Sequence, residues 1–257
     1  MIVTQRDKAL FEKLHSYAVM TTRQVANTVF PGIELTTTLR RLRKLERDNF
    51  IKRNTGLSTY EHSWTLTEKG AKLVSDRPPR WQQSRYLLEH DTKLTALRLA
   101  LETAGVAQSW IPEHEIRFKV ASRHGLEVAK DKLIPDGIMG VDWQGSKESI
   151  AIEVELHGKN SRRYFRNFHQ YKYKQNILGV WYLTPTPTLA RTIEKLWIKE
   201  VGINRKPYFY WSLIDEVIEK PLEAIVRSSK DRNTLPLIWR PQVRSDETKS
   251  RQAGGFQ

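Results

Sequence analysis

Three acidic side chains in the middle of the chain have the types and spacing of a cation site. Asp136 lies in the aliphatic run 134–138, and Glu153 and Glu155 alternate with aliphatic residues in the run 149–156. Residues two apart on a strand share one face, so Glu153 and Glu155 point the same way. Two carboxylates beside an apolar ladder repel each other and lose hydration, unless a cation or a basic side chain neutralises them.

Antiparallel pairing of the two runs would bring Asp136 and Glu153 to a common ion. Carboxylate oxygens suit a hard cation, so we expect Mg²⁺ or Mn²⁺. The alternative is that Glu153 and Glu155 form an exposed polar edge, while Asp136 accepts hydrogen bonds in a turn before Gly137. The residues alone leave both interpretations open.

A basic segment follows the acidic residues. The segment 159–174 contains six basic residues and no acidic residue. Its aromatic stripe at helical spacing, which we expect to pack on a sheet, is Tyr164, Phe168 and Tyr171. The residues that we expect to contact DNA phosphates near the carboxylates are Arg162, Arg163 and Arg166.

The composition favours a polyanionic partner. Among 257 residues there are 43 lysines and arginines against 29 acidic residues, a formal charge of +14. Nucleic acid is the expected partner, with an acidic lipid surface or simple solubility as alternatives. The absence of cysteine excludes disulfides and Cys-ligated zinc. The longest run without charged residues, 175–190, holds two prolines and predicts no membrane span, and without a secretory signal we expect a cytoplasmic protein.

The first part of the chain has the pattern of a small helical DNA-binding unit. Apolar spacing predicts helices over 6–20 and 23–30, and the turn at Pro31-Gly32 precedes a third helix. A hairpin is expected to end at the stretch 64–70, Trp-Thr-Leu-Thr-Glu-Lys-Gly. This order resembles the winged helix-turn-helix family, and the 64–70 stretch is similar to that family's wing exit. The resemblance covers residues 6–75.

The third helix carries a leucine stripe and a basic face. Leu35, Leu39, Leu42 and Leu45 predict its buried side. In a winged helix-turn-helix such a helix enters the major groove. The residues expected to contact DNA are Thr37, Arg40, Arg41 and Lys44. Alternatively, these charges only solvate a helix that is packed by its leucines.

Adjacent prolines mark a domain boundary, because proline disfavours helix in the residue before it. We therefore predict four parts: a winged helix-turn-helix domain at 1–75, a linker at 76–84, a nuclease-like domain at 85–240 and a disordered tail at 241–257. The second part is expected to be an α/β (α+β) domain with a mixed central sheet. Its predicted elements are a helix at 85–104, extended segments at 109–120, 132–143 and 149–156, a strand at 177–184, a helix at 188–201 and a last strand at 207–213.

The acidic residues and their elements resemble the PD-(D/E)xK nuclease superfamily, which has a restriction-endonuclease-like fold. The resemblance rests on Pro135-Asp136, then sixteen residues, then Glu153 and Glu155. That family places its lysine where Glu155 stands here, so the amine must come from elsewhere. Lys159 is the nearest lysine in sequence. The other lysines that could supply the amine are Lys172 and Lys174.

The two halves together resemble the MobC-type plasmid mobilisation relaxases and the replication-relaxation family. Three stretches carry this resemblance: Leu88-Glu-His90-Asp91, Ile134-Pro-Asp136 and the stretch 152–159. The resemblance implies a protein that recognises double-stranded DNA at a transfer origin and nicks one strand with a divalent metal. It also implies an accessory mobilisation or coupling protein as partner; a homodimer is left open.

Each acidic and basic residue of the predicted site has an expected role. Asp136 and Glu153 hold the metal, Glu155 holds a second ion or positions water, and Lys159 offsets charge on the phosphate. The accessory candidates are His90, Asp91, Glu115 and Tyr171. Tyrosine nucleophiles remain an alternative, with Tyr164, Tyr171 and Tyr173 as candidates.

Two other functions compete with the nickase. One is a DNA-binding replication or transcription regulator whose nuclease-like domain is inactive, which the glutamate at the lysine position favours. The other is a restriction or transposition endonuclease that makes double-strand cuts.

Overall fold

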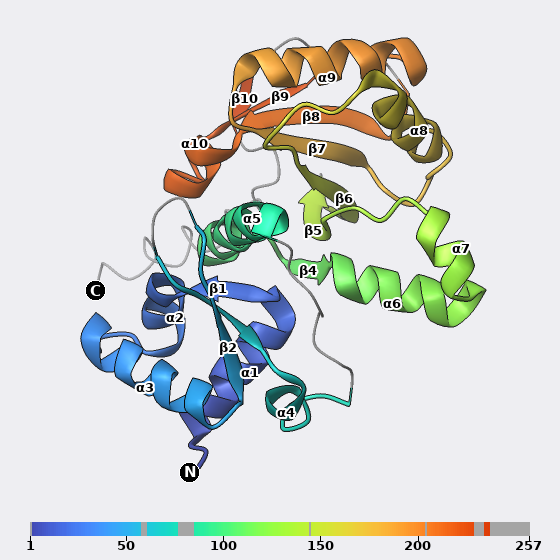
Figure 1. Cartoon of the computed structure of the whole chain (residues 1–257). Helices are drawn as coiled ribbons and strands as arrows, with labels where there is room; N and C mark the ends of the chain where they lie inside the picture. Colours follow the sequence, from blue (N-terminus) through green and yellow to red (C-terminus); the bar gives the residue numbers. More distant parts are fainter. Residues whose placement is uncertain are drawn as a thin grey trace, which may run out of the picture.

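The chain folds around two β-sheets that are joined by one long helix. The computed structural model describes residues 2–57, 61–76, 85–143, 145–203, 205–228 and 234–236. A three-stranded sheet has the order β1-β3-β2, and a seven-stranded sheet has the order β10-β9-β8-β7-β6-β5-β4. In Figure 1 the small sheet and helices α1 to α4 lie below, the large sheet lies above, and α5 runs between them. The expected mixed α/β architecture is confirmed.

The N-terminal elements form a compact helical unit on the small antiparallel sheet. They are α1 (Gln5–Tyr17), β1 (Val19–Thr21), α2 (Thr22–Val29), α3 (Leu35–Arg47), β2 (Ile51–Asn54), β3 (Ser63–Leu66) and α4 (Glu68–Ala71). Thr4 and Thr21 accept hydrogen bonds from the first turns of α1 and α2, which fixes where these helices begin. Phe11, Leu42 and Trp64 are fully buried between the helices and the sheet.

Two details of this unit differ from the sequence prediction. The helix expected over 6–20 ends at Tyr17, because Ala18 has a φ of 67° and the short strand β1 begins at the next residue. Val19 then pairs with Thr65 across the small sheet. Leu35 opens α3 with 42% of its surface exposed, so the buried stripe of that helix begins later than expected.

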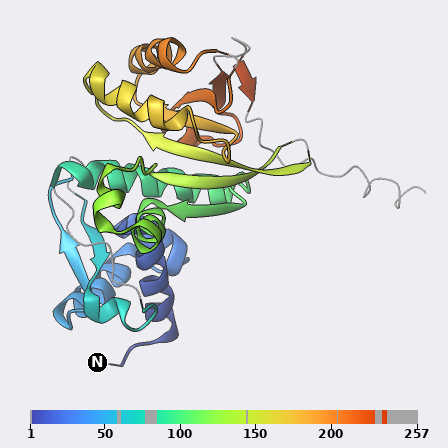
Figure 2. The same ribbon diagram turned by 90° about the vertical axis from the view of Figure 1, so that its right-hand side faces the viewer.

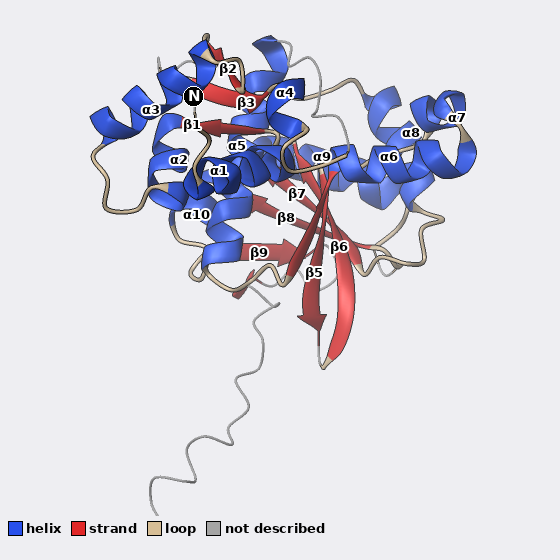
Figure 3. Ribbon diagram, turned by 90° about the horizontal axis from the view of Figure 1, so that it is seen from below, coloured by secondary structure: helices blue, strands red, loops and turns tan. Residues whose placement is uncertain are grey.

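The second part of the chain alternates helices and strands. Its elements are α5 (Arg85–Thr103), β4 (Ser109–Pro112), α6 (Glu113–His124), α7 (Leu126–Asp131), β5 (Gly137–Trp143), β6 (Ser146–Val154), α8 (Ser161–Tyr171), β7 (Gly179–Thr184), α9 (Pro187–Glu200), β8 (Tyr208–Leu213), α10 (Ile214–Glu219), β9 (Ile225–Ser228) and β10 (Thr234–Pro236). Strands β6, β7 and β8 run parallel, and the remaining neighbours pair antiparallel. Figure 3 shows the hairpin of β5 and β6 extending beyond the other strands.

The extended segment expected over 109–120 is wrong after its first four residues. The strand ends at Pro112, and α6 begins at Glu113. Acidic residues in the first turn of a helix are stabilised by its dipole, and Glu113 pairs with Arg117 one turn later at 2.7 Å. Glu115 therefore lies on a helix and not on a strand. The strand expected to be last, β8, is followed by α10, β9 and β10.

Helices cover both faces of the large sheet. On one face Tyr164 and Phe168 of α8 and Trp197 of α9 are buried against the strands, as expected for the aromatic stripe. On the other face Leu97 of α5 and Ile214 of α10 share a core with alternate residues of β6. Figure 2 shows α8 and α9 above the sheet and α5 below it. The predicted alternation along β6 is confirmed.

Helix α5 belongs to both halves of the molecule. Its Thr95 hydroxyl donates to the carbonyl of Val19 at 2.8 Å, and its Arg98 donates to the carbonyl of Ser16 at 2.9 Å. Its opposite side contributes Leu97 and Leu101 to the core of the large sheet. The two halves are thus held against one shared element.

Some predictions fall outside the described residues. These are positions 77–84 of the linker expected at 76–84 and the whole tail expected at 241–257, so the domain boundaries stay predictions. Within the described ranges, no helix combines the length and apolar character needed to cross a bilayer.

Candidate functional site

The predicted carboxylates lie at the end of the β5–β6 hairpin that faces α5 and α6. Gly137 pairs with Ile152, which sets Asp136 beside Glu153, and the backbone N–H of Val154 donates to Asp136 Oδ2 at 2.8 Å. Strand β6 ends at Val154, so Glu155 follows directly. The antiparallel pairing on which the expected convergence depended is therefore present. A cavity of about 470 Å³ opens here, and its lining includes Asp136, Glu153, Glu155, His90 and Lys159.

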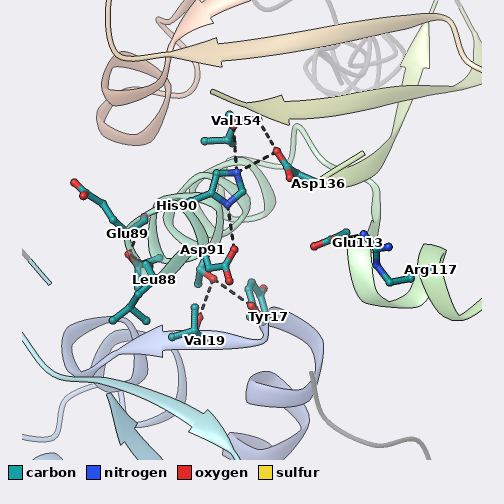
Figure 4. A network of polar contacts seen from close by, with 12 residues as sticks. Tyr17, Val19, Leu88, Glu89, His90, Asp91, Glu113, Arg117, Asp136 and Val154 are labelled. Carbon is teal, nitrogen blue, oxygen red and sulfur yellow. Dashed lines mark hydrogen bonds and ion pairs between the residues drawn. The ribbon is translucent and has the colours of Figure 1, made fainter. Parts of the chain in front are cut away.

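Helix α5 directs His90 at Asp136, as Figure 4 shows. The imidazole Nε2 lies 3.2 Å from Asp136 Oδ2 and 3.1 Å from the carbonyl of Val154, while Nδ1 lies 3.1 Å from Asp91 Oδ1. Both ring nitrogens face acceptors, which favours the doubly protonated ring. Burial lowers the pKa of His90, but Asp136 and Asp91 outweigh it and raise that pKa to about 10. An imidazolium–carboxylate pair therefore stands at the cavity.

Asp136 carries the negative charge of this pair. Burial raises its pKa, but the charge of His90, the hydrogen bonds from His90 and Val154, and the charge of Lys159 together lower it below the ordinary value. His90 thus holds and charge-balances the Asp136 carboxylate, while Asp91 holds the other ring nitrogen of His90.

Glu153 is held in the protonated form at neutral pH. Its side chain is buried, and burial first and the charge of Asp136 second raise its pKa to about 8. The Tyr171 hydroxyl donates a hydrogen bond to Glu153 Oε1. The repulsion between carboxylates expected from the sequence is therefore present, and a proton relieves it.

Glu155 and Lys159 form the third component of the cavity. Lys159 Nζ lies 2.6 Å from Glu155 Oε2, and the Glu155 side chain is only 6% exposed. Burial raises the pKa of Glu155, and the charge of Lys159 opposes this rise. The Lys159 charge also acts on Asp136 and Glu153, so the amine lies near all three carboxyl groups.

The two other candidate lysines are placed differently. Lys172 donates to the carbonyl of Glu200 at 3.1 Å, on the α9 side of α8. Lys174 lies within electrostatic reach of Glu153, and burial lowers the pKa of its amine. Of the three lysines, Lys159 lines the cavity.

The oxygen ligands here fit a metal that keeps much of its water. Among the described residues, no group of three or more His, Cys, Asp or Glu side chains is arranged to hold a metal ion. Asp136 and Glu153 offer two carboxylates at one cavity, and Mg²⁺ is commonly bound through one or two carboxylates plus water and phosphate oxygens. The site fits a hydrated Mg²⁺ or Mn²⁺ and not a cage made entirely by protein.

Helix α6 supplies cavity residues, of which sequence reasoning missed Arg117. Glu113 and Arg117 line the cavity as an ion pair, whereas the predicted accessory residue Glu115 does not line it. Figure 4 shows Glu113 and Arg117 beside Asp136. The spacing of an acid and an arginine four residues apart could have indicated a helix there.

The candidate tyrosines divide by exposure. Tyr164 and Tyr171 are 2% and 0% exposed, and Tyr173 is 65% exposed. Burial first and the charge of Glu153 second raise the pKa of Tyr171 well above its ordinary range. Its hydroxyl is engaged with Glu153, so Tyr171 supports a carboxylate and is poorly placed to attack a phosphate.

The predicted DNA contacts on α3 differ in their surroundings. Thr37, Arg40 and Lys44 are exposed. Arg41 instead donates through Nε to Asp7 Oδ1 at 2.8 Å, and Asp7 is fully buried in the first turn of α1. A buried carboxylate needs a partner of opposite charge, so Arg41 joins α3 to α1. The expected DNA contact of Arg41 stays a prediction, and the structure gives this side chain a structural partner.

The predicted contacts on α8 lie at the protein surface. Arg162, Arg163 and Arg166 are exposed, and Arg163 also lines the cavity. The basic face of α8 is therefore continuous with the carboxylate site.

Comparison with known proteins gives one match. A family model described as replication-relaxation matches residues 11–175, a range that includes α3, His90, Asp136 and the acidic end of β6. No curated protein and no solved structure matches the chain.

Proposed function

Because the chain belongs to the replication-relaxation family, with more than half of its length matched, we propose that it is a DNA-binding protein of plasmid replication or relaxation that nicks one DNA strand. The observation that carries the nicking activity is the meeting of Asp136, Glu153, Glu155 and Lys159 at one cavity. Acidic oxygens beside an amine are the components that phosphodiester hydrolysis requires.

Each side chain has a role in the proposed reaction. Asp136 and Glu153 would hold Mg²⁺ or Mn²⁺ once Glu153 has released its proton, and the ion would polarise the phosphodiester and lower the pKa of an attacking water. Lys159 offsets the negative charge that develops on the phosphate, and Glu155 keeps its amine at the cavity through the 2.6 Å ion pair. His90 and Asp91 orient Asp136 from α5.

The N-terminal unit is proposed to be a winged helix that recognises double-stranded DNA. Three helices followed by an antiparallel hairpin, in a sheet of order β1-β3-β2, support this proposal. Helix α3 would enter the major groove with its exposed Thr37, Arg40 and Lys44. The proposal extends to a transfer origin as the DNA site, to a PD-(D/E)xK-type core and to an accessory mobilisation or coupling protein.

A nicking assay with isosteric variants tests the proposed activity. Asp136→Asn and Glu153→Gln should each lower nicking of a supercoiled plasmid carrying the cognate origin by about 100-fold or more, with DNA binding retained. Glu115→Gln is the matched control, because this α6 carboxylate does not line the cavity. Wild-type nicking by both cavity variants would refute the assignment.

A second function is favoured by one departure from the nuclease pattern. Glu155 stands where the superfamily has its lysine, and Asp136 is bonded to His90. These features suit a DNA-binding regulator whose core does not cut. Calorimetric titration with Mn²⁺ separates the two functions: the nickase requires binding that Glu153→Gln weakens, and the regulator requires none.

A further inference from the structure

The outer side of α8 interleaves cations with aromatic rings. Four residues at helical spacing along this side are Arg162, Phe165, Arg166 and His169, and Tyr173 lies in the turn directly after the helix; we call these five residues the α8 outer patch. They face away from the buried aromatic stripe of the same helix. Arg162 and Arg166 form no ion pair with any acidic residue in the described part of the chain.

The aromatic members of the patch are open to solvent. Tyr173 is 65% exposed and contacts His169 edge-on, with ring centroids 5.2 Å apart. Phe165 is partly exposed, and Lys199 of α9 lies over its ring at 5.6 Å. Helices α8 and α9 pack against each other, so Lys199 extends the patch onto α9.

One acidic residue touches the edge of the patch. Glu200 Oε1 lies 3.4 Å from His169 Nδ1 and 3.9 Å from Lys172 Nζ. Two basic groups thus surround this carboxylate, and the patch keeps a positive balance.

We propose that the α8 outer patch binds single-stranded DNA by stacking bases on Phe165 and Tyr173 while Arg162, Arg166 and Lys199 contact the phosphates. Cations alone would attract duplex and single strand alike, but exposed rings can stack only with bases that are not already stacked in a duplex. Arg163 lies on the same helix and lines the cavity, so a bound strand would lead to or from the carboxylates. The inference concerns a surface outside the cavity and stands whether or not the cavity cuts DNA.

Binding measured by fluorescence anisotropy in EDTA tests this surface without any cleavage. The probes are a labelled dT oligonucleotide of about 12 nucleotides, within the range of single-strand site sizes, and a hairpin duplex. Tyr173→Ala and Phe165→Leu should each weaken dT binding by on the order of 10-fold and leave duplex binding unchanged. Tyr173→Phe should bind as the wild type does, because the ring and not the hydroxyl stacks.

Helix α6 offers matched controls. Phe118 is 45% exposed and Arg123 is exposed, so Phe118→Ala and Arg123→Ala remove the same kinds of group elsewhere. Both should leave dT binding unchanged, whereas Arg166→Ala should lower the slope of log affinity against log salt by about 0.7.

Several results would overturn the proposal. Tyr173 is exposed, so Tyr173→Ala should fold as the wild type does. Wild-type affinity of this variant for dT would refute the proposed stacking. An equal loss of duplex binding, a loss in Tyr173→Phe, or an equal effect of the α6 controls would do the same. Tighter binding of a U-only RNA of the same length would overturn the assignment to DNA.

Discussion

Two carboxylates of this chain, the fully buried Asp7 in the N-terminal unit and the partly buried Asp136 at the cavity, each face a cation from another element, but in different surroundings. Asp7 pairs with the guanidinium of Arg41, which is charged at all ordinary pH values, and also caps α1. Asp136 pairs with the imidazolium of His90 and has a second carboxylate, Glu153, beside it. The first pair is a structural link between two helices, whereas the second lines a cavity that contains further carboxyl groups.

The comparison predicts its largest effect at Asp7. Asp7→Ala should lower the free energy of unfolding by about 3 kcal/mol, because it leaves Arg41 without its buried partner and removes the hydrogen bond that the Thr4 N–H donates to Asp7 in the capping box of α1. Urea denaturation at neutral pH measures this change. Asp131→Ala, at an exposed carboxylate on α7, should change stability by less than about 0.5 kcal/mol. Equal effects of the two substitutions would contradict the structural role of the Asp7 pair.

Asp7 and two other groups of the cavity, Glu153 and His90, should respond to opposite ends of the pH scale. The pKa of Asp7 is lowered, because Arg41 and Thr4 outweigh its burial, so its contribution is present above the unfolded pKa of about 3.9 and is lost in stronger acid. The pKa values of Glu153 and His90 are raised to about 8 and about 10, so their contributions decline as pH rises through those values.

Glu153→Gln sharpens this pH contrast. Folded Glu153 holds a proton that the unfolded chain has already lost between pH 4.5 and about 8, so wild-type stability falls over that window. The variant carries no such proton, so its stability should fall less between pH 6 and pH 9, by about 2 to 3 kcal/mol. Chemical denaturation at both pH values tests this, and an unchanged pH dependence would refute the raised pKa.

A smaller effect should appear in the titration of His90. Asp136→Asn removes the largest attraction that raises the pKa of His90, so this pKa should fall by on the order of 1 to 3 units, toward neutral pH. NMR can follow the titration of the imidazole ring in the wild type and the variant. Glu115→Gln should leave the His90 titration where it is. A His90 pKa that stays near its wild-type value in Asp136→Asn would show that the pair does not control it.

Local pattern predicted the acidic end of β6 well. Residues 137–143 and 146–154 form a hairpin with a short connection, so alternation along β6 and a single turn were enough to bring Asp136 and Glu153 together. The aromatic stripe of α8 was likewise readable from helical spacing. Both features depend on residues that are near each other in sequence.

Partners from distant elements could not be predicted in this way. His90 meets Asp136 across 46 residues, and Arg41 meets Asp7 across 34. Helical spacing identifies the face on which Arg41 lies, but not the buried acid that another helix brings to it. The short strand β1 was not predicted from the sequence for the same reason, because this strand is defined by its pairing with β3.

Helix α5 has a consequence for where a cut would fall. One end carries His90 to the carboxylates, and later turns hold β1 and the end of α1 through Thr95 and Arg98. The N-terminal unit that contains α3 and the carboxylate cavity are therefore both held by one helix. Under the proposed function, the distance along the DNA between the recognised sequence and the cleaved bond is set by the geometry of this helix and not by the length of a flexible linker.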